Sequence, residues 1–250
     1  MPAQPPVLTG SSYLRAGWHA MWQPGLRRYV VIPALLNTLL LISLIGWAGH
    51  GFNTLLEQLL GTLPDWLGFL QWLLWPLFAI LLLLVLFFTF SILANLIGSP
   101  FYAVLAEKLA QQRRGEAPQP GHWQSWLWLI PHSIGRELAK LAYYLPRLVG
   151  LLLLSLLPVV NLVVTPLLLV FGVWVMAVQY LDYQADNDGI SLNEQLDWMR
   201  QRRTLMMSFG LPVYLGSLIP LINVMIMPAA VAGSTLLWVE HYARQPKTIN

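Results

Sequence analysis

The sequence predicts an all-α integral membrane protein with two long transmembrane helices, two re-entrant helical hairpins and amphipathic helices at the membrane surface. Of its 250 residues, 57% are hydrophobic and 10% are charged, whereas a soluble domain carries about 25% charged residues. The apolar residues form four charge-free stretches, at 29–56, 66–106, 148–181 and 204–239. Each stretch exceeds the roughly 20 residues with which a helix crosses a hydrocarbon core.

The first two stretches predict the membrane spans. Residues 1–28 are polar at their start and lack the apolar core of a cleavable signal, so we expect an interfacial helix there and self-insertion of the span at 29–56. The stretch 66–106 would form a helix of about 60 Å, twice the thickness of a hydrocarbon core. We therefore expect a tryptophan-rich approach, a span over 76–95 and a return segment broken at 98–100.

The last two stretches contain an internal repeat. The order proline, asparagine, proline occurs twice at a constant spacing, at Pro158, Asn161 and Pro166 and then at Pro220, Asn223 and Pro228. Because an internal proline removes a backbone donor and obstructs the preceding turn, we expect short arms at 148–157 and 167–181.

Arms of this length do not cross a membrane. The pattern therefore predicts hairpins at 148–181 and 204–239 that enter the membrane partway, with Pro158, Asn161, Pro220 and Asn223 at their tips. Irregular backbone at that depth must be covered by protein or line a water-filled cavity. The alternative is six ordinary spans with tight turns at the two motifs.

Basic residues are confined to one side in either arrangement. All 14 Lys and Arg lie in 1–28, 107–147, 182–203 and the tail 240–250, and the loop 49–65 has none. The positive-inside rule makes that side cytoplasmic and requires an even number of crossings.

Two basic regions, 107–147 and 182–203, contain predicted amphipathic helices. Arg136, Lys140 and Arg147 share one helical face, while three leucines, at 138, 141 and 145, lie on the opposite face. Ser191 and Glu194 form a capping-box pattern ahead of a second amphipathic stretch. The arginines either meet anionic lipid or line a mouth that gathers anions. The candidate pore or ion-pair residues are Glu107, Arg113, Arg136, Asp182 and Arg203.

The segment QPGLRRY, residues 23–29, is a candidate anion site. Pro24 and Gly25 interrupt the chain, and the following helix is expected to begin with free N–H groups and a positive dipole. Arg27 and Arg28 add guanidinium groups that grip two oxygens at once. The side chains of GLRR, residues 25–28, offer hydrogen-bond donors only, which suits the fully deprotonated sulfate better than phosphate. The alternative role for the two arginines is topology signalling beside the first span.

Several other classes are disfavoured. The chain has no cysteine, which excludes thiolate metal sites and a cysteine nucleophile. It has no GxxxxGK[ST] loop, no GxGxxG opening a helix and no HExxH pattern. We therefore expect neither an enzyme nor a metal, cofactor or nucleic-acid partner, and a single membrane domain over 1–250.

Four separated strings resemble the CysZ family of bacterial sulfate permeases. They are QPGLRRYVVIPALLN, IGSPFYAVLAEKL, QYLDYQADN and IPLINVMIMPAAVAGSTLLW, which occur here in that order. The resemblance implies sulfate uptake across the inner membrane for cysteine synthesis, by an oligomer of protomers with two spans and two membrane-penetrating hairpins. It also implies that Gly25, Leu26 and Arg27 bind sulfate, with Arg28 beside them. The family's protomers are described in opposite orientations, whereas the charge bias here predicts one. A permease for another oxyanion and a non-transporting scaffold remain the alternatives.

Overall fold

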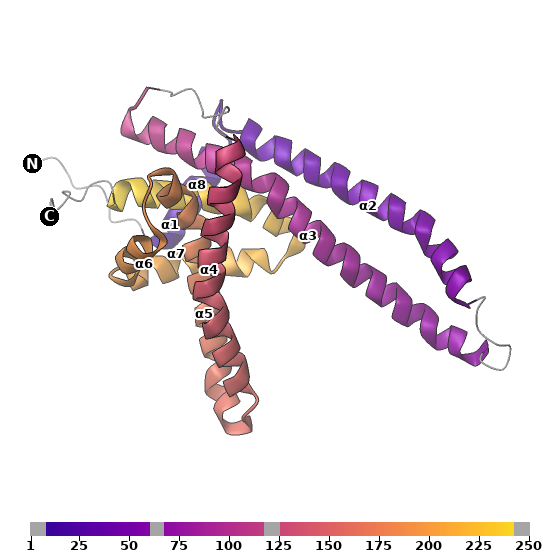
Figure 1. The fold of residues 1–250 in the computed structure, drawn as a ribbon. Coiled ribbons are helices and arrows are strands. Elements are labelled where there is room, and N and C mark those ends of the chain that lie inside the picture. The colour runs from indigo at the N-terminus through magenta and orange to yellow at the C-terminus, as the bar shows by residue number, and fades with distance from the viewer. Residues whose placement is uncertain (1–8, 61–67, 118–125, 243–250) are drawn as a thin grey trace, which may run out of the picture. The chain divides into compact units, whose positions relative to one another are not determined.

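The described part of the chain is helical, which confirms the all-α class. The computed structural model describes residues 9–60, 68–117 and 126–242, and these ranges contain no strand. Their helices, drawn in Figure 1, are α1 (Gly10–Met21), α2 (Arg28–Leu60), α3 (Gly68–Arg114), α4 (Trp126–Ser155), α5 (Pro158–Asn187), α6 (Leu192–Arg200), α7 (Arg203–Ser217) and α8 (Pro220–His241). Four described segments are long and apolar enough to cross a membrane, at Arg28–Ala48, Gly135–Ser155, Pro158–Asn187 and Ile222–His241.

The chain divides into two compact units. One unit is Val30–Phe101, which holds most of α2 and the first part of α3. The expectation that α3 would break at 98–100 is wrong, because the helix runs unbroken over 47 residues with Pro76 and Pro100 inside it. A proline costs one helical hydrogen bond and bends the axis. The residues that follow Pro100 include many strong helix formers, such as Ala, Leu, Glu, Lys and Gln, so the helix continues past the bend.

The other unit is built around α8. It comprises Met1–Tyr29 and Tyr102–Asn250, and in it α8 packs against α1, α5 and α7. Residues 229–239 of α8 are buried without interruption. A helix that is apolar on every face is stable only when neighbours surround it, and the small residues in the run AAVAGST let those neighbours approach closely.

Glycines set the closest approach between α1 and α8. A methyl group on Gly17 would lie 2.3 Å from the carbonyl oxygen of Ala229 and 2.3 Å from the amide nitrogen of Gly233. A methyl group on Gly233 would lie 2.6 Å from the carbonyl oxygen of Tyr13. The two backbones therefore touch directly, and dispersion between them replaces side-chain interdigitation.

The two proline motifs adopt the same local structure. Pro158 and Pro220 each open a helix, after Leu157 and Ile219 in extended conformation. The Asn161 amide donates to the Leu157 carbonyl at 2.9 Å, and the Asn223 amide donates to the Ile219 carbonyl at 2.8 Å. The turns thus lie just before the prolines, and each asparagine belongs to the first helical turn rather than to the tip.

The predicted arm lengths are wrong for the first hairpin. Pro166 lies inside α5, which extends over 30 residues, and α4 continues from the basic region to Ser155 without a break, also over 30 residues. Each arm is about 45 Å long at about 1.5 Å per residue. In the second hairpin α7 has 15 residues, about 22 Å, which is shorter than a hydrocarbon core of about 30 Å.

The length of α7 predicts how the second tip responds to labelling. In this cysteine-free chain, Leu218→Cys at the turn is expected to resist a membrane-impermeant maleimide added from the periplasmic side, because α7 is too short to carry it across. Leu156→Cys, at the turn of the first hairpin, tests that hairpin in the same way. Labelling of Leu218→Cys at the rate of a cysteine in the predicted loop 49–65 would contradict re-entry of the second hairpin.

The glycine contact predicts a stability loss. Gly17→Ala is expected to destabilise the protein by about 1–3 kcal/mol, the usual cost of overpacking, because the added methyl meets backbone on both sides. Gly46→Ala is the control, since nothing lies within 4 Å of a methyl group there. The measurement is thermal unfolding of the purified protein in one detergent. Equal unfolding midpoints for wild type and Gly17→Ala would show that α1 does not pack on α8 as described.

Candidate anion-binding segment and buried charge clusters

The QPGLRRY segment forms a tight connection between α1 and α2. Gly25 has a φ of +90°, a left-handed conformation that glycine adopts without steric cost. The next side chain, Leu26, is 1% exposed and anchors the connection in the α8 unit. Arg27 and Arg28 lie on either side of the start of α2 and are both exposed. The segment therefore presents two guanidinium groups from a fixed backbone.

The expectation of free N–H groups here is wrong for three residues. The amides of Leu26 and Arg27 donate to the Gln23 carbonyl at 3.0 and 3.2 Å, and the amide of Tyr29 donates to the Leu26 carbonyl at 2.9 Å. These bonds arise because the positive φ of Gly25 folds the chain into successive turns before α2. The Arg28 guanidinium also lies 4.8 Å from the centroid of the Tyr29 ring. An anion at this segment would be held mainly by the arginine side chains.

A buried charge cluster joins α4 to α5. Asp182 of α5 accepts from Arg136 Nε at 2.8 Å through one carboxylate oxygen, and its other oxygen lies 2.9 Å from Lys140 Nζ. The three side chains are 7%, 11% and 3% exposed, in the order Asp182, Arg136 and Lys140. Charges buried to this extent persist only when they are paired and hydrogen-bonded. Arg136 and Asp182, two of the predicted candidates, are thus brought together.

Arg136 extends the same cluster to α6. Its guanidinium lies 3.2 Å from Asp186 and donates to the Ile190 carbonyl at 2.5 Å and to Gln195 Oε1 at 3.1 Å. Gln195 in turn donates to the Val178 carbonyl at 3.1 Å. The planar fork of a guanidinium allows one side chain to serve several acceptors at once. Arg136 therefore fixes α4, α5 and α6 relative to one another.

The predicted amphipathic character of α4 is correct, and of the alternatives for its charged face the ion-pair role holds for Arg136. The three leucines opposite, Leu138, Leu141 and Leu145, are more than half exposed, as lipid-facing side chains are. Arg136 and Lys140 face protein rather than anionic lipid. The sequence could not distinguish these cases, because a carboxylate partner 42 residues from Lys140 leaves no local signature.

A second charge cluster is centred on Asp188, just after α5. Arg114, at the end of α3, donates to both oxygens of Asp188 at 2.9 and 2.6 Å, and the Trp238 indole donates to the same carboxylate at 2.9 Å. Gln184 donates to it as well, at 2.9 Å. The hydrogen bond to Asp188 raises the pKa of the Arg114 guanidinium above its usual value. The bidentate geometry ties the end of α3 to α5 and α8.

The other candidates are not drawn into these clusters. Glu107 accepts from Gln111 at 3.1 Å one turn along α3. Arg113 and Arg203 are exposed, and within the described ranges neither has an ion-pair partner. The capping box is confirmed, since Ser191 accepts from the Glu194 amide at 3.2 Å and α6 begins at the next residue.

The fold and the two charge clusters indicate which class of protein this is. Several helices are long enough to cross a membrane, leucines face outward over α4, and the buried Arg136, Lys140 and Asp182 are paired with one another inside the helical unit. These are the properties of a multi-pass α-helical membrane protein.

The chain belongs to the family described as Sulfate transporter CysZ/Etoposide-induced protein 2.4, which residues 13–228 match. It is 50% identical to the Sulfate transporter CysZ of Pseudomonas fluorescens (strain Pf0-1) over 241 residues, 96% of each chain. It is 49% identical to that of Pseudomonas aeruginosa (strain LESB58), covering 94% of this chain and 96% of the relative. For the protein of the same name from Pectobacterium atrosepticum, the identity is 37% and the coverage 96% and 88%. The resemblance seen in the four strings is therefore confirmed.

The Asp182 cluster predicts a large and specific stability effect. Asp182→Asn leaves Arg136 and Lys140 buried with less countercharge, and we expect a loss of about 3–5 kcal/mol in the free energy of unfolding. Asp197→Asn, which removes an exposed pair with Arg200, should cost about 0–1 kcal/mol. Unfolding titrated with sodium dodecyl sulfate in mixed micelles measures both.

A second substitution that removes a buried charge tests the cause of this stability loss. Adding Lys140→Met to Asp182→Asn takes away one buried cation and should recover part of the lost stability. If the double variant is less stable than Asp182→Asn alone, loss of countercharge is not the reason for the effect.

Proposed function

We propose that this protein is a sulfate permease of the bacterial inner membrane that supplies sulfate for assimilation into cysteine. The proposal is supported by relatives named Sulfate transporter CysZ that align over nearly the whole chain. The structural observation that carries it is the arginine pair of the GLRR segment, residues 25–28, held exposed by a buried leucine and a left-handed glycine. Family membership makes the chain a transporter homologue rather than an enzyme homologue.

The chemistry of the GLRR segment favours sulfate. Sulfate at neutral pH carries no proton, so its site needs donors only, whereas phosphate usually keeps a proton and rewards an acceptor. Residues 23–29 contain no carboxylate. Two guanidinium groups can each give parallel N–H donors to a tetrahedral anion, and Gly25, Leu26, Arg27 and Arg28 are our proposed binding set.

The two charge clusters have a different proposed role. Arg136 and Asp182 already satisfy each other, so they hold α4 against α5 rather than bind a passing anion. Glu107 and Arg113 remain proposed pore residues, because they are free of strong pairing in the described structure and lie near the end of α3. Arg203 is not kept among them, because it lines a groove with α4 and α5 instead. We further propose that the protein works as a homo-oligomer, in which some of the exposed leucines of α4 face another protomer.

The energy of sulfate entry constrains the mechanism. Moving one charge through about 100 mV corresponds to about 2.3 kcal/mol, so a dianion entering a negative interior costs roughly twice that. Passive flow inward therefore requires that intracellular consumption keep free sulfate very low. This condition fits a protein that feeds a biosynthetic route.

The proposal predicts the effect of Arg27→Gln on flux. Uptake of ³⁵S-sulfate into proteoliposomes should fall at least about tenfold, the equivalent of about 1.4 kcal/mol, because a charge-assisted double contact is removed. Arg15→Gln is the matched control, since Arg15 is an exposed arginine of α1 outside the segment. Binding to detergent-purified protein, measured by calorimetry, should weaken in parallel.

Two results would contradict separate parts of this proposal. Wild-type protein that passes no labelled sulfate would remove the permease function and favour a scaffold role. Flux of Arg27→Gln at the wild-type rate would leave the function standing and remove the site. A permease for another oxyanion would show faster uptake of ³²P-phosphate or molybdate than of sulfate in the same vesicles.

A further inference from the structure

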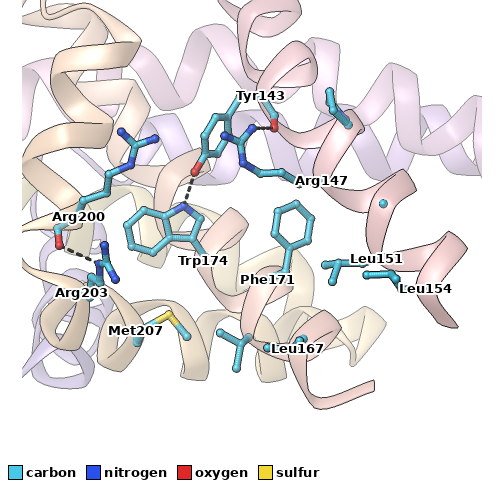
Figure 2. Close-up of a pocket in the computed structure, with 13 residues that line it drawn as sticks. Tyr143, Arg147, Leu151, Leu154, Leu167, Phe171, Trp174, Arg200, Arg203 and Met207 are labelled. Carbon is cyan, nitrogen blue, oxygen red and sulfur yellow. Dashed lines mark hydrogen bonds between the residues drawn. The ribbon is translucent and has the colours of Figure 1, made fainter. Parts of the chain in front are cut away.

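A groove lined by α4, α5, α7 and the last residue of α6 combines arginines with apolar side chains. Its volume is about 690 Å³, within the usual range of about 300–1,000 Å³ for ligand sites. Figure 2 shows Arg200, Arg203 and Trp174 gathered toward one end and Leu151 and Leu154 toward the other. The lining also includes Tyr143, Pro146, Arg147, Gly150, Leu167, Val170, Phe171 and Met207. All of these residues belong to the α8 unit.

The order of side chains along both hairpin arms is the same. On α4, Tyr143 and Arg147 are followed one and two turns nearer the tip by Leu151 and Leu154. On α5, Trp174 is followed toward the tip by Phe171 and Leu167. The groove thus changes from cationic and aromatic to aliphatic as it approaches the turn at 156–157. Tryptophan and tyrosine favour the headgroup level of a bilayer, and leucine favours the hydrocarbon.

The cationic end has unused capacity for an anion. The Arg147 guanidinium lies 3.9 Å from the centroid of the Tyr143 ring and has no carboxylate partner among the described residues. Arg203 Nε donates to the Arg200 carbonyl at 3.1 Å, which leaves its terminal nitrogens to face the groove in Figure 2. Arg200 is paired with Asp197 at 2.6 Å. Three guanidiniums therefore meet one carboxylate here.

The depth of the groove matches one leaflet. Arg147 precedes the turn at Leu156 by nine residues, about 13 Å along the helix, and half of a hydrocarbon core is about 15 Å. The Trp174 indole donates to the Tyr143 hydroxyl at 3.2 Å and closes the cationic end. The aliphatic part of the groove adds no binding free energy for a hydrated inorganic dianion. The arginines add little for a lipid without net charge.

We propose that this groove binds one anionic phospholipid, with its phosphate at Arg147 and Arg203 and an acyl chain along Leu151, Leu154 and Leu167. The charge of the arginine end and the apolar lining together select this ligand over either a small anion or a zwitterionic lipid. The site is separate from the GLRR segment and does not depend on sulfate transport. In this site Arg147 of α4 and Arg203 of α7 together bind one lipid headgroup.

The test uses the purified full-length protein and two lipids with the same chains. In native mass spectrometry, dioleoyl phosphatidylglycerol is expected to bind at least tenfold more tightly than dioleoyl phosphatidylcholine. Arg147→Gln combined with Arg203→Gln should weaken phosphatidylglycerol at least tenfold and weaken phosphatidylcholine less, because the choline of that lipid already offsets the charge of its phosphate. Arg15→Gln should bind both lipids as wild type does.

A second variant tests the apolar part. Nothing lies within 4 Å of a methyl group placed on Gly150, so Gly150→Phe should fill the groove without displacing backbone and should weaken both lipids. Helical content and elution volume equal to wild type confirm folding of each variant.

Three outcomes would overturn the proposal. They are equal affinity of wild type for the two lipids, unchanged phosphatidylglycerol affinity in the double arginine variant, and displacement of the lipid by sodium sulfate or glycerol phosphate at equal ionic strength. The last result would mean that the groove binds a small anion.

Discussion

The arrangement of the α4–α5 hairpin depends on one carboxylate. Asp182 must meet two cations of α4, and this requirement fixes the rotation of α4 about its axis. Once Arg136 and Lys140 face inward, Leu138 and Leu141 must face outward, and Tyr143 and Arg147, one and two turns further along the same face, must line the groove. A helix that is apolar over most of its length has little else to set its orientation against a neighbour, because lipid is as apolar as leucine.

The sequence was most informative where the signal was local. Composition and charge-free stretches predicted the helical membrane class, the capping box predicted the start of α6, and the repeat predicted that Pro158 and Pro220 occupy equivalent places. These features depend on residues within one or two turns of each other. For the same reason the family was recognisable from four short strings.

The predictions from sequence were wrong where residues outside the immediate neighbourhood determine the structure. Pro100 and Pro166 were expected to end helices, but each lost hydrogen bond is offset by the long helix-forming runs on both sides. The cationic partners of Asp182 and Asp188 lie 42 to 74 residues away, and no periodicity in the sequence indicates a contact at that separation. The GLRR segment was found from residue types alone, yet its use of backbone amides within its own turns required the dihedral angle of Gly25.

The packing of α1 on α8 has a consequence for synthesis of the chain. Tyr13 donates to Glu240 at 2.7 Å across 227 residues, so α1 can meet its main partner only after α8 has been synthesised. At elongation rates of about 5–20 residues per second, that delay is on the order of 10–40 s. In the interval α1, with Trp18 and its glycine face uncovered, can rest on the membrane surface as an amphipathic helix. The α8 unit is therefore completed only once α8 has been made, because α8 is the helix on which α1, α5 and α7 pack.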